Sequence, residues 1–321
     1  MTVVIKVGGA RAVDPAGALA DVAALVAGEH SEAAERTSGE QSDPRAEDGE
    51  DVALVHGGST AVDDTLERLG IEPEYVETPS GVVGRFTDDE TMEVFEMAFG
   101  HLNTRLVAGL QGQGVDAVGL NGVDGTLLYG PRKSAVRVIE DGKRRIRRGD
   151  HSGTIERVNA DLLETLLAGG YTPVAAPPMA GKDGEARSAS DGSSGDDEEP
   201  RDRIVPVNTD ADRSAAHIAG ALDATLVLLT DVEGIYRDPE DPDTLIESVE
   251  TPAEWEALED AAEGFMGRKV MAVEEALSGG ADEVVVADAN ADEPVLSALS
   301  GGGTRVLASA LESETDTSEE D

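Results

Sequence analysis

Short apolar runs alternate with longer amphipathic stretches along most of the chain. The runs at 2–8, 51–56, 225–231 and 283–287 are rich in valine and leucine and end in glycine or polar residues, which is typical of buried strands. The stretches between them carry alanine and leucine at helical spacing. Strands that alternate with helices predict an α/β fold, a three-layer α/β/α sandwich around a mainly parallel sheet.

The same pattern predicts the remaining elements. Thr87 and Glu90 have the spacing of a capping box, which predicts a long helix from there towards Gln111. Further strands are expected near 115–120, 172–176, 204–207 and 304–308, and helices at 14–27, from Ser59 or Thr60 to Leu69, and at 157–168, 211–222, 252–262 and 267–278. Residues 126–148 predict β-hairpins, with a turn at Asp141-Gly142.

Three segments lack apolar periodicity. Residues 29–51 and 181–203 are rich in Asp, Glu, Ser and Gly, and residues 312–321 are similar. They predict two solvated acidic insertions and a disordered tail, with solubility as their plainest role. Residues 1–311 are then expected to form one domain.

Charge is the strongest signal in the composition. Sixty-seven acidic residues against 25 basic ones give a formal net charge of −42. Recurrent apolar runs argue against global disorder, so the charge favours a halophilic cytoplasm, in which salt screens carboxylate repulsion. There is no cysteine, and the five histidines lack ligand spacing, so no metal site is expected. The absence of a signal-like or membrane-length apolar run favours a cytoplasmic protein without a membrane partner.

Two glycine turns follow strands. The first strand ends in Lys6-Val7-Gly8-Gly9 and the second in His56-Gly57-Gly58-Ser59. Glycine lets backbone N–H groups approach phosphate oxygens, and the helix after the second turn favours anions. Either turn alone suits any tight strand-to-helix connection. The pair at one sheet edge indicates a phosphate ligand, although neither matches a P-loop or a dinucleotide-binding motif.

Two of the five lysines occupy unusual positions. Lys6 lies in a strand expected to be buried, and Lys269 lies near the start of an expected helix, where its charge opposes the helix dipole. Both positions suit cations that contact a phosphoryl group. A lysine that extends from a strand end, and an ordinary exposed helix residue, are the respective alternatives.

Other polar residues follow strands or precede helices. If the helix began early enough, Asn208 and Asp212 would share one of its faces, where they could bind a polar substrate and position a lysine. The alternative is that Asn208 or Asp210 caps the N-terminus of the helix. Arg85 could pair with a carboxylate or remain a surface residue. The run LVLLTDVEGIY suits a nucleotide pocket, and equally any strand followed by a turn.

The motifs KVGG, HGGS, GRFT, VNTDAD, LLTDVEGIY and GFMGRK, in this order, resemble the amino acid kinase family, and acetylglutamate kinases in particular. The resemblance spans nearly the whole chain and implies that family's fold, with ATP and Mg²⁺ as cofactors and a carboxylate as acceptor. It also implies a substrate-binding lobe to about residue 207 and a nucleotide-binding lobe from about 208 to 311. Ser59 departs from the family's usual third glycine. The resemblance implies catalytic roles for Lys6, Lys269 and Asp212, substrate binding by Gly57, Gly58, Ser59, Arg85 and Asn208, and nucleotide binding by Gly8, Gly9, Thr230, Asp231 and Tyr236.

Eight of the 25 basic residues fall within 17 positions, from Arg132 to Arg148. If this island of basic residues lies on a hairpin, it predicts a docking face for an acidic partner. The alternative is that it only balances the negative charge of neighbouring acidic loops. With its flanking segments the island is similar to the branch of the family whose substrate is carried by an acidic amino-group carrier protein, LysW. The docking residues expected from it are Arg132, Lys133, Lys143, Arg144, Arg145, Arg147 and Arg148.

That branch phosphorylates the side-chain carboxylate of carrier-linked glutamate or 2-aminoadipate, in arginine or lysine biosynthesis; the glutamate role is the first choice here. Free N-acetylglutamate is the rival acceptor within the family. A non-catalytic nucleotide or amino acid sensor is the alternative from another class, disfavoured by the presence of both lysines. No aromatic residues interleave the arginines, so nucleic acid is not expected as a partner. Relatives imply a homodimer.

Overall fold

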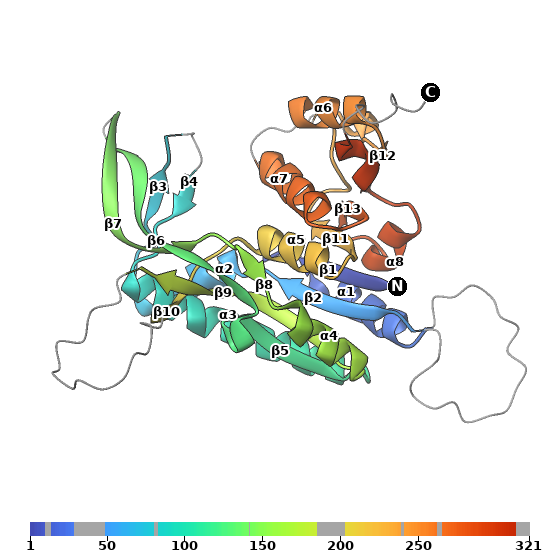
Figure 1. Ribbon diagram of the computed structural model, residues 1–321, viewed down its shortest axis with the longest axis horizontal. Coiled ribbons are helices and arrows are strands. Elements are labelled where there is room, and N and C mark those ends of the chain that lie inside the picture. Colours follow the sequence, from blue (N-terminus) through green and yellow to red (C-terminus); the bar gives the residue numbers. More distant parts are fainter. Residues whose placement is uncertain are drawn as a thin grey trace, which may run out of the picture.

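The computed structural model describes residues 1–9, 14–28, 49–79, 83–140, 142–184, 203–238, 241–261 and 265–312. A mostly parallel sheet fills the centre, with helices on both of its faces (Figure 1). This arrangement confirms the predicted α/β class.

The main sheet has the order β12-β14-β13-β11-β1-β2-β9-β6-β7, with β5 and β10 paired to β9 and β8 paired to β6. The central strands β13, β11, β1, β2 and β9 run parallel. A separate antiparallel pair, β3-β4, lies beside the β6-β7 hairpin (Figure 1). The strands are β1 Thr2–Val7, β2 Asp51–His56, β3 Tyr75–Glu77, β4 Val83–Arg85, β5 Ala117–Gly122, β6 Leu128–Glu140, β7 Lys143–Gly153, β8 Arg157–Val158, β9 Thr172–Asp183, β10 Arg203–Val207, β11 Thr225–Thr230, β12 Ser248–Val249, β13 Glu283–Asp288 and β14 Thr304–Leu307.

The helices form the two outer layers. They are α1 Pro15–Val26, α2 Ser59–Leu69, α3 Asp89–Gln111, α4 Ala160–Ala168, α5 Ala211–Ala221, α6 Pro252–Ala261, α7 Phe265–Ser278 and α8 Pro294–Leu299, with short 3-10 turns η1 Asp124–Thr126, η2 Pro242–Thr244 and η3 Ala308–Leu311. Within the described residues, no helix combines the length and hydropathy needed to cross a membrane.

The alternation of side chains along β1 shows how the layers form. Val3, Ile5 and Val7 pack into a core that includes buried residues of α1, α3 and α8. Val4 points to the opposite face, into a core that includes residues of α4, α5, α6 and α7. Lys6 is two residues beyond Val4 and therefore faces the α5 side, where it is only 7% exposed.

Two predicted helix starts are wrong. Ser59 is the first residue of α2, and the cap position is Gly58, without a side-chain hydrogen bond. Asp88, rather than Thr87, caps α3, because its carboxylate accepts the N–H of Thr91. Thr87 is fully buried instead.

The β6-β7 hairpin confirms the predicted hairpin. Glu140 pairs with Lys143, and Gly142 has a φ of +70°, a conformation that favours glycine in a tight turn. The hairpin passes its predicted end at 148, since β7 continues to Gly153. Its other strand, β6, begins within the main sheet, where Tyr129 pairs with Ala180 of β9.

Strands extend into the ends of both predicted acidic insertions. Within 181–203, β9 continues to Asp183 and β10 begins at Arg203, because these strands pair with Lys182 opposite Ile204. Within 29–51, Asp51 opens β2. The greater part of both segments, 29–48 and 185–202, and the predicted tail 313–321 lie outside the described residues. The main sheet is continuous through 1–207 and 208–307, so the division into two lobes stays a prediction.

Candidate active site

A cleft of about 700 Å³ opens where β1, β2 and β11 end. The residues that line it come from segments far apart in the sequence. Of the predicted catalytic, substrate-binding and cofactor-binding residues, the cleft is lined by Lys6, Gly8, Gly9, Gly57, Gly58, Ser59, Arg85, Asn208, Asp212, Thr230, Asp231 and Lys269. Tyr236 is not among the lining residues.

The two lysines meet around one carboxylate. Lys6 reaches across from β1 to the first turn of α5, where its Nζ forms an ion pair with Asp212. Lys269 is half-buried. Burial lowers the pKa of its ammonium group, the Asp212 carboxylate opposes that lowering, and the Lys6 charge adds to it. The Lys269 charge therefore acts on the same anion and the same cation that form the ion pair.

Helix α5 begins at Ala211, as predicted, and the start of α7 differs from the prediction. Asp210 caps α5 by accepting the N–H groups of Asp212 and Arg213, so Asn208 lies before the helix and does not share a face with Asp212. Helix α7 begins at Phe265 rather than at 267, so Lys269 stands in its second turn rather than its first.

The two glycine turns pack against each other. A Cβ on Gly9 would lie 2.7 Å from the Cα of Gly58 and closer still to the backbone nitrogen of Gly58. Gly57 donates its N–H to Val7 O at 3.0 Å, which joins the end of β2 to the end of β1. Contact between two backbones therefore requires glycine at position 9, whether or not a phosphate approaches it.

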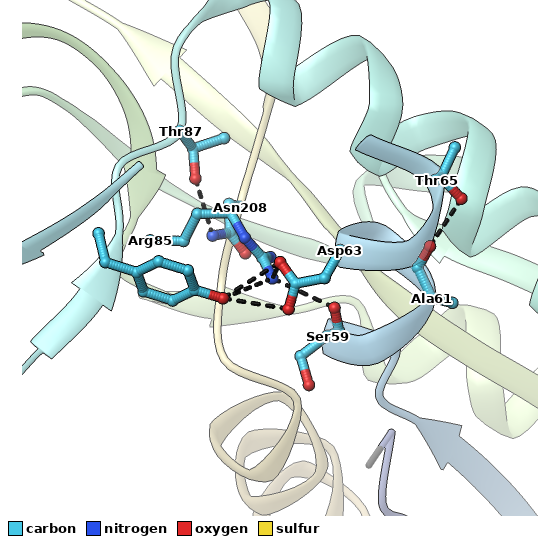
Figure 2. Close-up of polar contacts among 8 residues, drawn as sticks. Ser59, Ala61, Asp63, Thr65, Arg85, Thr87 and Asn208 are labelled. Atoms are coloured by element: carbon cyan, nitrogen blue, oxygen red, sulfur yellow. Dashed lines mark hydrogen bonds and ion pairs between the residues drawn. The ribbon is translucent and has the colours of Figure 1, made fainter. Parts of the chain in front are cut away.

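Arg85 also lines the cleft, and Figure 2 shows the contacts around it. Its Nη2 lies 2.6 Å from Asp63 Oδ1 and 3.1 Å from Ser59 O. Tyr75, which pairs with Arg85 across the β3-β4 ribbon, directs its hydroxyl at both oxygens of Asp63. Neither Asp63 nor Tyr75 is among the predicted site residues. The four-residue spacing of Ser59 and Asp63, one helical turn, is the only sequence signal that could have pointed to Asp63.

Asn208 is fixed on three sides. Its N–H donates to His151 O at 2.6 Å, its carbonyl accepts the N–H of Gly153 at 2.9 Å, and its Nδ2 donates to Thr87 Oγ1 at 3.2 Å (Figure 2). The backbone therefore holds this amide at the edge of the cleft. Thr87 takes part in the site although the sequence indicated only a helix cap.

The predicted nucleotide residues end β11 and enter the next loop. Thr230 is buried, and its hydroxyl donates to Asp231 Oδ1 at 3.1 Å. The Tyr236 hydroxyl donates to Glu233 at 3.1 Å, and burial together with this contact raises the pKa of Tyr236.

The predicted docking residues lie on the β6-β7 hairpin and at its base. Residues directly opposite each other in an antiparallel pair share a face, so the register divides the hairpin into two faces. The inner face carries Val138, which has no exposed surface, and Arg147, which binds Glu74 and lies 4.5 Å from the centre of the Phe86 ring. The inner face also carries Lys143 and Arg145 nearer the tip, and Arg145 contacts Glu140 at 3.4 Å.

The outer face carries three exposed arginines around an apolar residue. Arg144 and Arg148 flank Ile146 along β7, and Arg137 stands opposite Ile146 on β6. Ile146 is 67% exposed. Arg132, at the base, binds Asp150 O and Asp183 instead, while the neighbouring Lys133 is exposed.

Comparison with known proteins places the chain. The model of the amino acid kinase family matches residues 1–288. The chain is 40% identical over 307 residues to the [LysW]-aminoadipate kinase of Deinococcus radiodurans, covering 95% of this chain and 91% of that protein. It is 38% identical to the [LysW]-aminoadipate kinase of Thermus thermophilus, covering 95% and 99%, and 42% identical to the acetylglutamate kinase of Methanopyrus kandleri, covering 74% and 85%.

Solved structures support the fold. N-acetylglutamate synthase from Neisseria gonorrhoeae superposes with a TM-score of 0.64 at 22% identity; the match covers 95% of this chain, which spans 59% of the synthase chain. Carbamate kinase from Giardia lamblia gives a TM-score of 0.56 at 16% identity and covers 95% of this chain and 98% of that one. With the family match over residues 1–288, this chain belongs to the amino acid kinase family.

Proposed function

We propose that the chain is an ATP-dependent kinase that phosphorylates the side-chain carboxylate of glutamate, or of 2-aminoadipate, attached to an acidic amino-group carrier protein, LysW. The observation that carries this proposal is one cleft that is lined both by Arg85 and by two lysines whose charges act on Asp212. Two relatives that match nearly the whole chain are named [LysW]-aminoadipate kinase, and others are named [LysW]-aminoadipate/[LysW]-glutamate kinase, which supports a carrier-linked acceptor of either kind. The reaction would belong to arginine or lysine biosynthesis in the cytoplasm.

The chemistry needs little from the protein beyond positioning and positive charge. A carboxylate is already ionised at neutral pH, so its oxygen attacks the γ-phosphorus of ATP without a general base, and ADP leaves. Lys6 and Lys269 stabilise the negative charge on the transferring group, and Asp212 holds Lys6 in position. The backbone of the two glycine turns faces the phosphates, while Thr230, Asp231 and Tyr236 lie towards the nucleotide.

Mg²⁺ would supply further charge neutralisation. Among the described residues, no group of three or more His, Asp or Glu side chains could hold a metal ion by itself. Mg²⁺ commonly keeps water ligands and binds through nucleotide phosphates with one or two carboxylates. Asp210, Asp212 and Asp231 line the cleft, so its donor set suits a magnesium ion that arrives with ATP.

The carrier would dock on the outer face of the hairpin. Arg137, Arg144 and Arg148 present positive charge around exposed Ile146, a combination that suits an acidic surface with a small apolar contact. Arg147 and Arg132 are bound to acidic residues of this chain and would mainly support the hairpin. Lys133, Lys143 and Arg145 would add charge around that face. We propose a homodimer and no nucleic acid or membrane partner.

A comparison of acceptors tests the proposal. The purified protein would be assayed at high salt for acyl phosphate, trapped as the hydroxamate, with carrier-linked glutamate, carrier-linked 2-aminoadipate and free N-acetyl-L-glutamate. Turnover of a carrier-linked acceptor in preference to the free one is expected. Equal turnover of free N-acetyl-L-glutamate would contradict the carrier role, and ATP binding without turnover of any acceptor would favour a sensor.

A further inference from the structure

The acceptor end of the cleft holds a second charged group, Asp63, directly against Arg85. The Arg85 side chain is 7% exposed and the Asp63 side chain 36% exposed, and Arg85 Nη2 lies 2.6 Å from Asp63 Oδ1. The other cations that line the cleft are Lys6 and Lys269, near Asp212, and Arg213, which binds Glu275. Among the described lining residues, Arg85 is therefore the cation available to an acceptor carboxylate, and an internal carboxylate already contacts it.

The contacts of Arg85 are distributed unevenly over its guanidinium group. Nη2 meets Asp63, Ser59 O and the Tyr75 hydroxyl, the last at 3.3 Å. Nε is buried and has no hydrogen-bond partner among the described residues. A buried donor without a partner is costly, so an acceptor at this nitrogen would be favourable. The centres of the Tyr75 and Phe95 rings each lie 5.7 Å from the guanidinium carbon of Arg85. These rings limit the directions in which the guanidinium group can turn.

Asp63 is held so that it can contact Arg85 without fixing it completely. It stands one helical turn after Ser59 on α2, so one face of that helix supplies both the backbone oxygen and the carboxylate that contact Nη2. The Tyr75 hydroxyl lies 3.1 Å from Oδ1 and 3.0 Å from Oδ2. Asp63 could therefore stay on the Tyr75 hydroxyl after yielding Arg85 to another carboxylate.

We propose that Asp63 is a specificity-determining residue of the acceptor site: its carboxylate occupies Arg85 in the empty enzyme, and an acceptor carboxylate must displace it or share the guanidinium with it. The idea rests on the proposed function, since it presupposes a carboxylate acceptor. Two carboxylates on one guanidinium repel each other, so Asp63 weakens acceptor binding. The ion pair selects for ligands with an anionic group that reaches Arg85 and excludes neutral analogues, which cannot compete with an internal anion.

The test uses Asp63→Asn, which keeps the size and one carbonyl oxygen of the side chain but removes its charge. With the carrier-linked glutamate acceptor, the KM for the acceptor is expected to fall about fivefold or more, the lower range of typical coupling between ligands, with kcat and the KM for ATP unchanged. Glu67→Gln, one turn further along α2, is the matched control; Glu67 is exposed, and its loss should leave the KM for the acceptor unchanged.

The experiment distinguishes a failure of this inference from a failure of the proposed function. If the unaltered enzyme turns over no carboxylate acceptor, the proposed function fails. If it does, and Asp63→Asn leaves the acceptor KM unchanged or raises it, Asp63 merely supports Arg85 and the inference is overturned. An equal fall in KM for Glu67→Gln would overturn it as well, because net charge would then explain the effect. Circular dichroism and the unchanged KM for ATP would show that the variant is folded.

Discussion

The ammonium group of Lys6 and the carboxylate of Asp212 form an ion pair between the end of β1 and the first turn of α5. Lys6 is 7% exposed, so the pair is largely removed from water and weakly screened by salt. Removal of Asp212 would leave the Lys6 ammonium without this carboxylate and exposed to the charge of Lys269. The pair therefore fixes a cation at the place where the two glycine turns and Lys269 converge.

Removal of either lysine should therefore impair the chemical step. Lys6→Ala and Lys269→Ala are each expected to lower kcat about 10²–10³-fold, by analogy with the loss of one oxyanion donor. Single-turnover kinetics with saturating ATP would measure the chemical step directly. Lys182→Ala, which removes an exposed ammonium group outside the cleft lining, is the control and should leave kcat unchanged. Full activity in either cleft variant would contradict the mechanism.

His56 should make stability depend on pH. Burial lowers its pKa to about 4, opposed by the contact between Nδ1 and Gly57 O. Nε2 lies 3.3 Å from Asn103 Nδ2, so the neutral tautomer with a proton on Nδ1 satisfies both contacts. The folded pKa is below the unfolded value near 6.5, so the stabilisation is present above about pH 6.5 and is lost as the pH falls towards 4.

Denaturant unfolding at about pH 7.5 and about pH 5 would measure this effect. Between these pH values the unaltered protein should lose about 2 kcal/mol more unfolding free energy than His56→Gln, which has no titrating ring. The difference between the two proteins removes the contribution of the many carboxylates, since both share it. Equal losses would show that His56 is protonated as readily in the folded protein as in the unfolded chain.

The elements of the fold were largely predictable because each buried strand has its own apolar run. The alternation in Val3-Val4-Ile5-Lys6 even predicts which face of β1 carries the lysine. The short strands β3 and β4 were missed, since three residues carry too little periodicity to be recognised. The starts of α2 and α3 were misplaced because Ser, Thr and Asp are all acceptable caps, and packing decides between them.

The site was predictable only where a residue type carries the chemistry. Lysines and glycines at strand ends indicated the phosphate end of the cleft. Asp63, Tyr75 and Thr87 were missed because each acts through a contact across the fold, such as Thr87 with Asn208, 121 positions apart. The inner and outer faces of the hairpin were also hidden, because the bulge near Ser134 and the position of the turn set the register of β6 and β7.

Gly9 should tolerate no side chain. Gly9→Ala would push the first glycine turn away from Gly57 and Gly58, and overpacking of this kind costs about 1–3 kcal/mol of unfolding free energy. Gly100→Ala is the matched control, because a Cβ there meets nothing within 4 Å and alanine favours the α3 helix by about 0.5–1 kcal/mol. Denaturant unfolding of both variants should give opposite signs. A stabilising effect at position 9 would contradict the packed turns.

The acidic composition should make the protein more stable in concentrated salt. With a formal net charge of −42, repulsion between carboxylates opposes folding, and the screening length falls from about 10 Å at 0.1 M to about 3 Å at 1 M salt. The melting temperature is expected to rise by roughly 5 °C or more between 0.1 M and 1 M KCl. Sucrose at matched osmolality separates screening from solute exclusion. A melting temperature independent of KCl would argue against halophilic adaptation.

The two faces of the β6-β7 hairpin allow a test of carrier docking within one element. Arg144→Glu combined with Arg148→Glu reverses charge on the outer face, beside Ile146, and should raise the KM for a carrier-linked acceptor about tenfold at moderate salt. The KM for ATP should not change, because neither residue lines the cleft. The effect should shrink as KCl increases, since exposed charges are screened.

Arg145→Glu is the matched reversal on the inner face, beside Glu140, and should change the acceptor KM less than either outer reversal made singly. A surface ion pair contributes about 0–1 kcal/mol, so each single reversal is expected to have a small effect on the acceptor KM. A larger effect at Arg144 or Arg148 than at Arg145 would distinguish docking on the outer face from a general response to positive charge. Equal effects of Arg145→Glu and Arg148→Glu would mean that the carrier responds to the hairpin's net charge. A partner held in that way would have no defined orientation, and the exposure of Ile146 on one face would then have no role in binding.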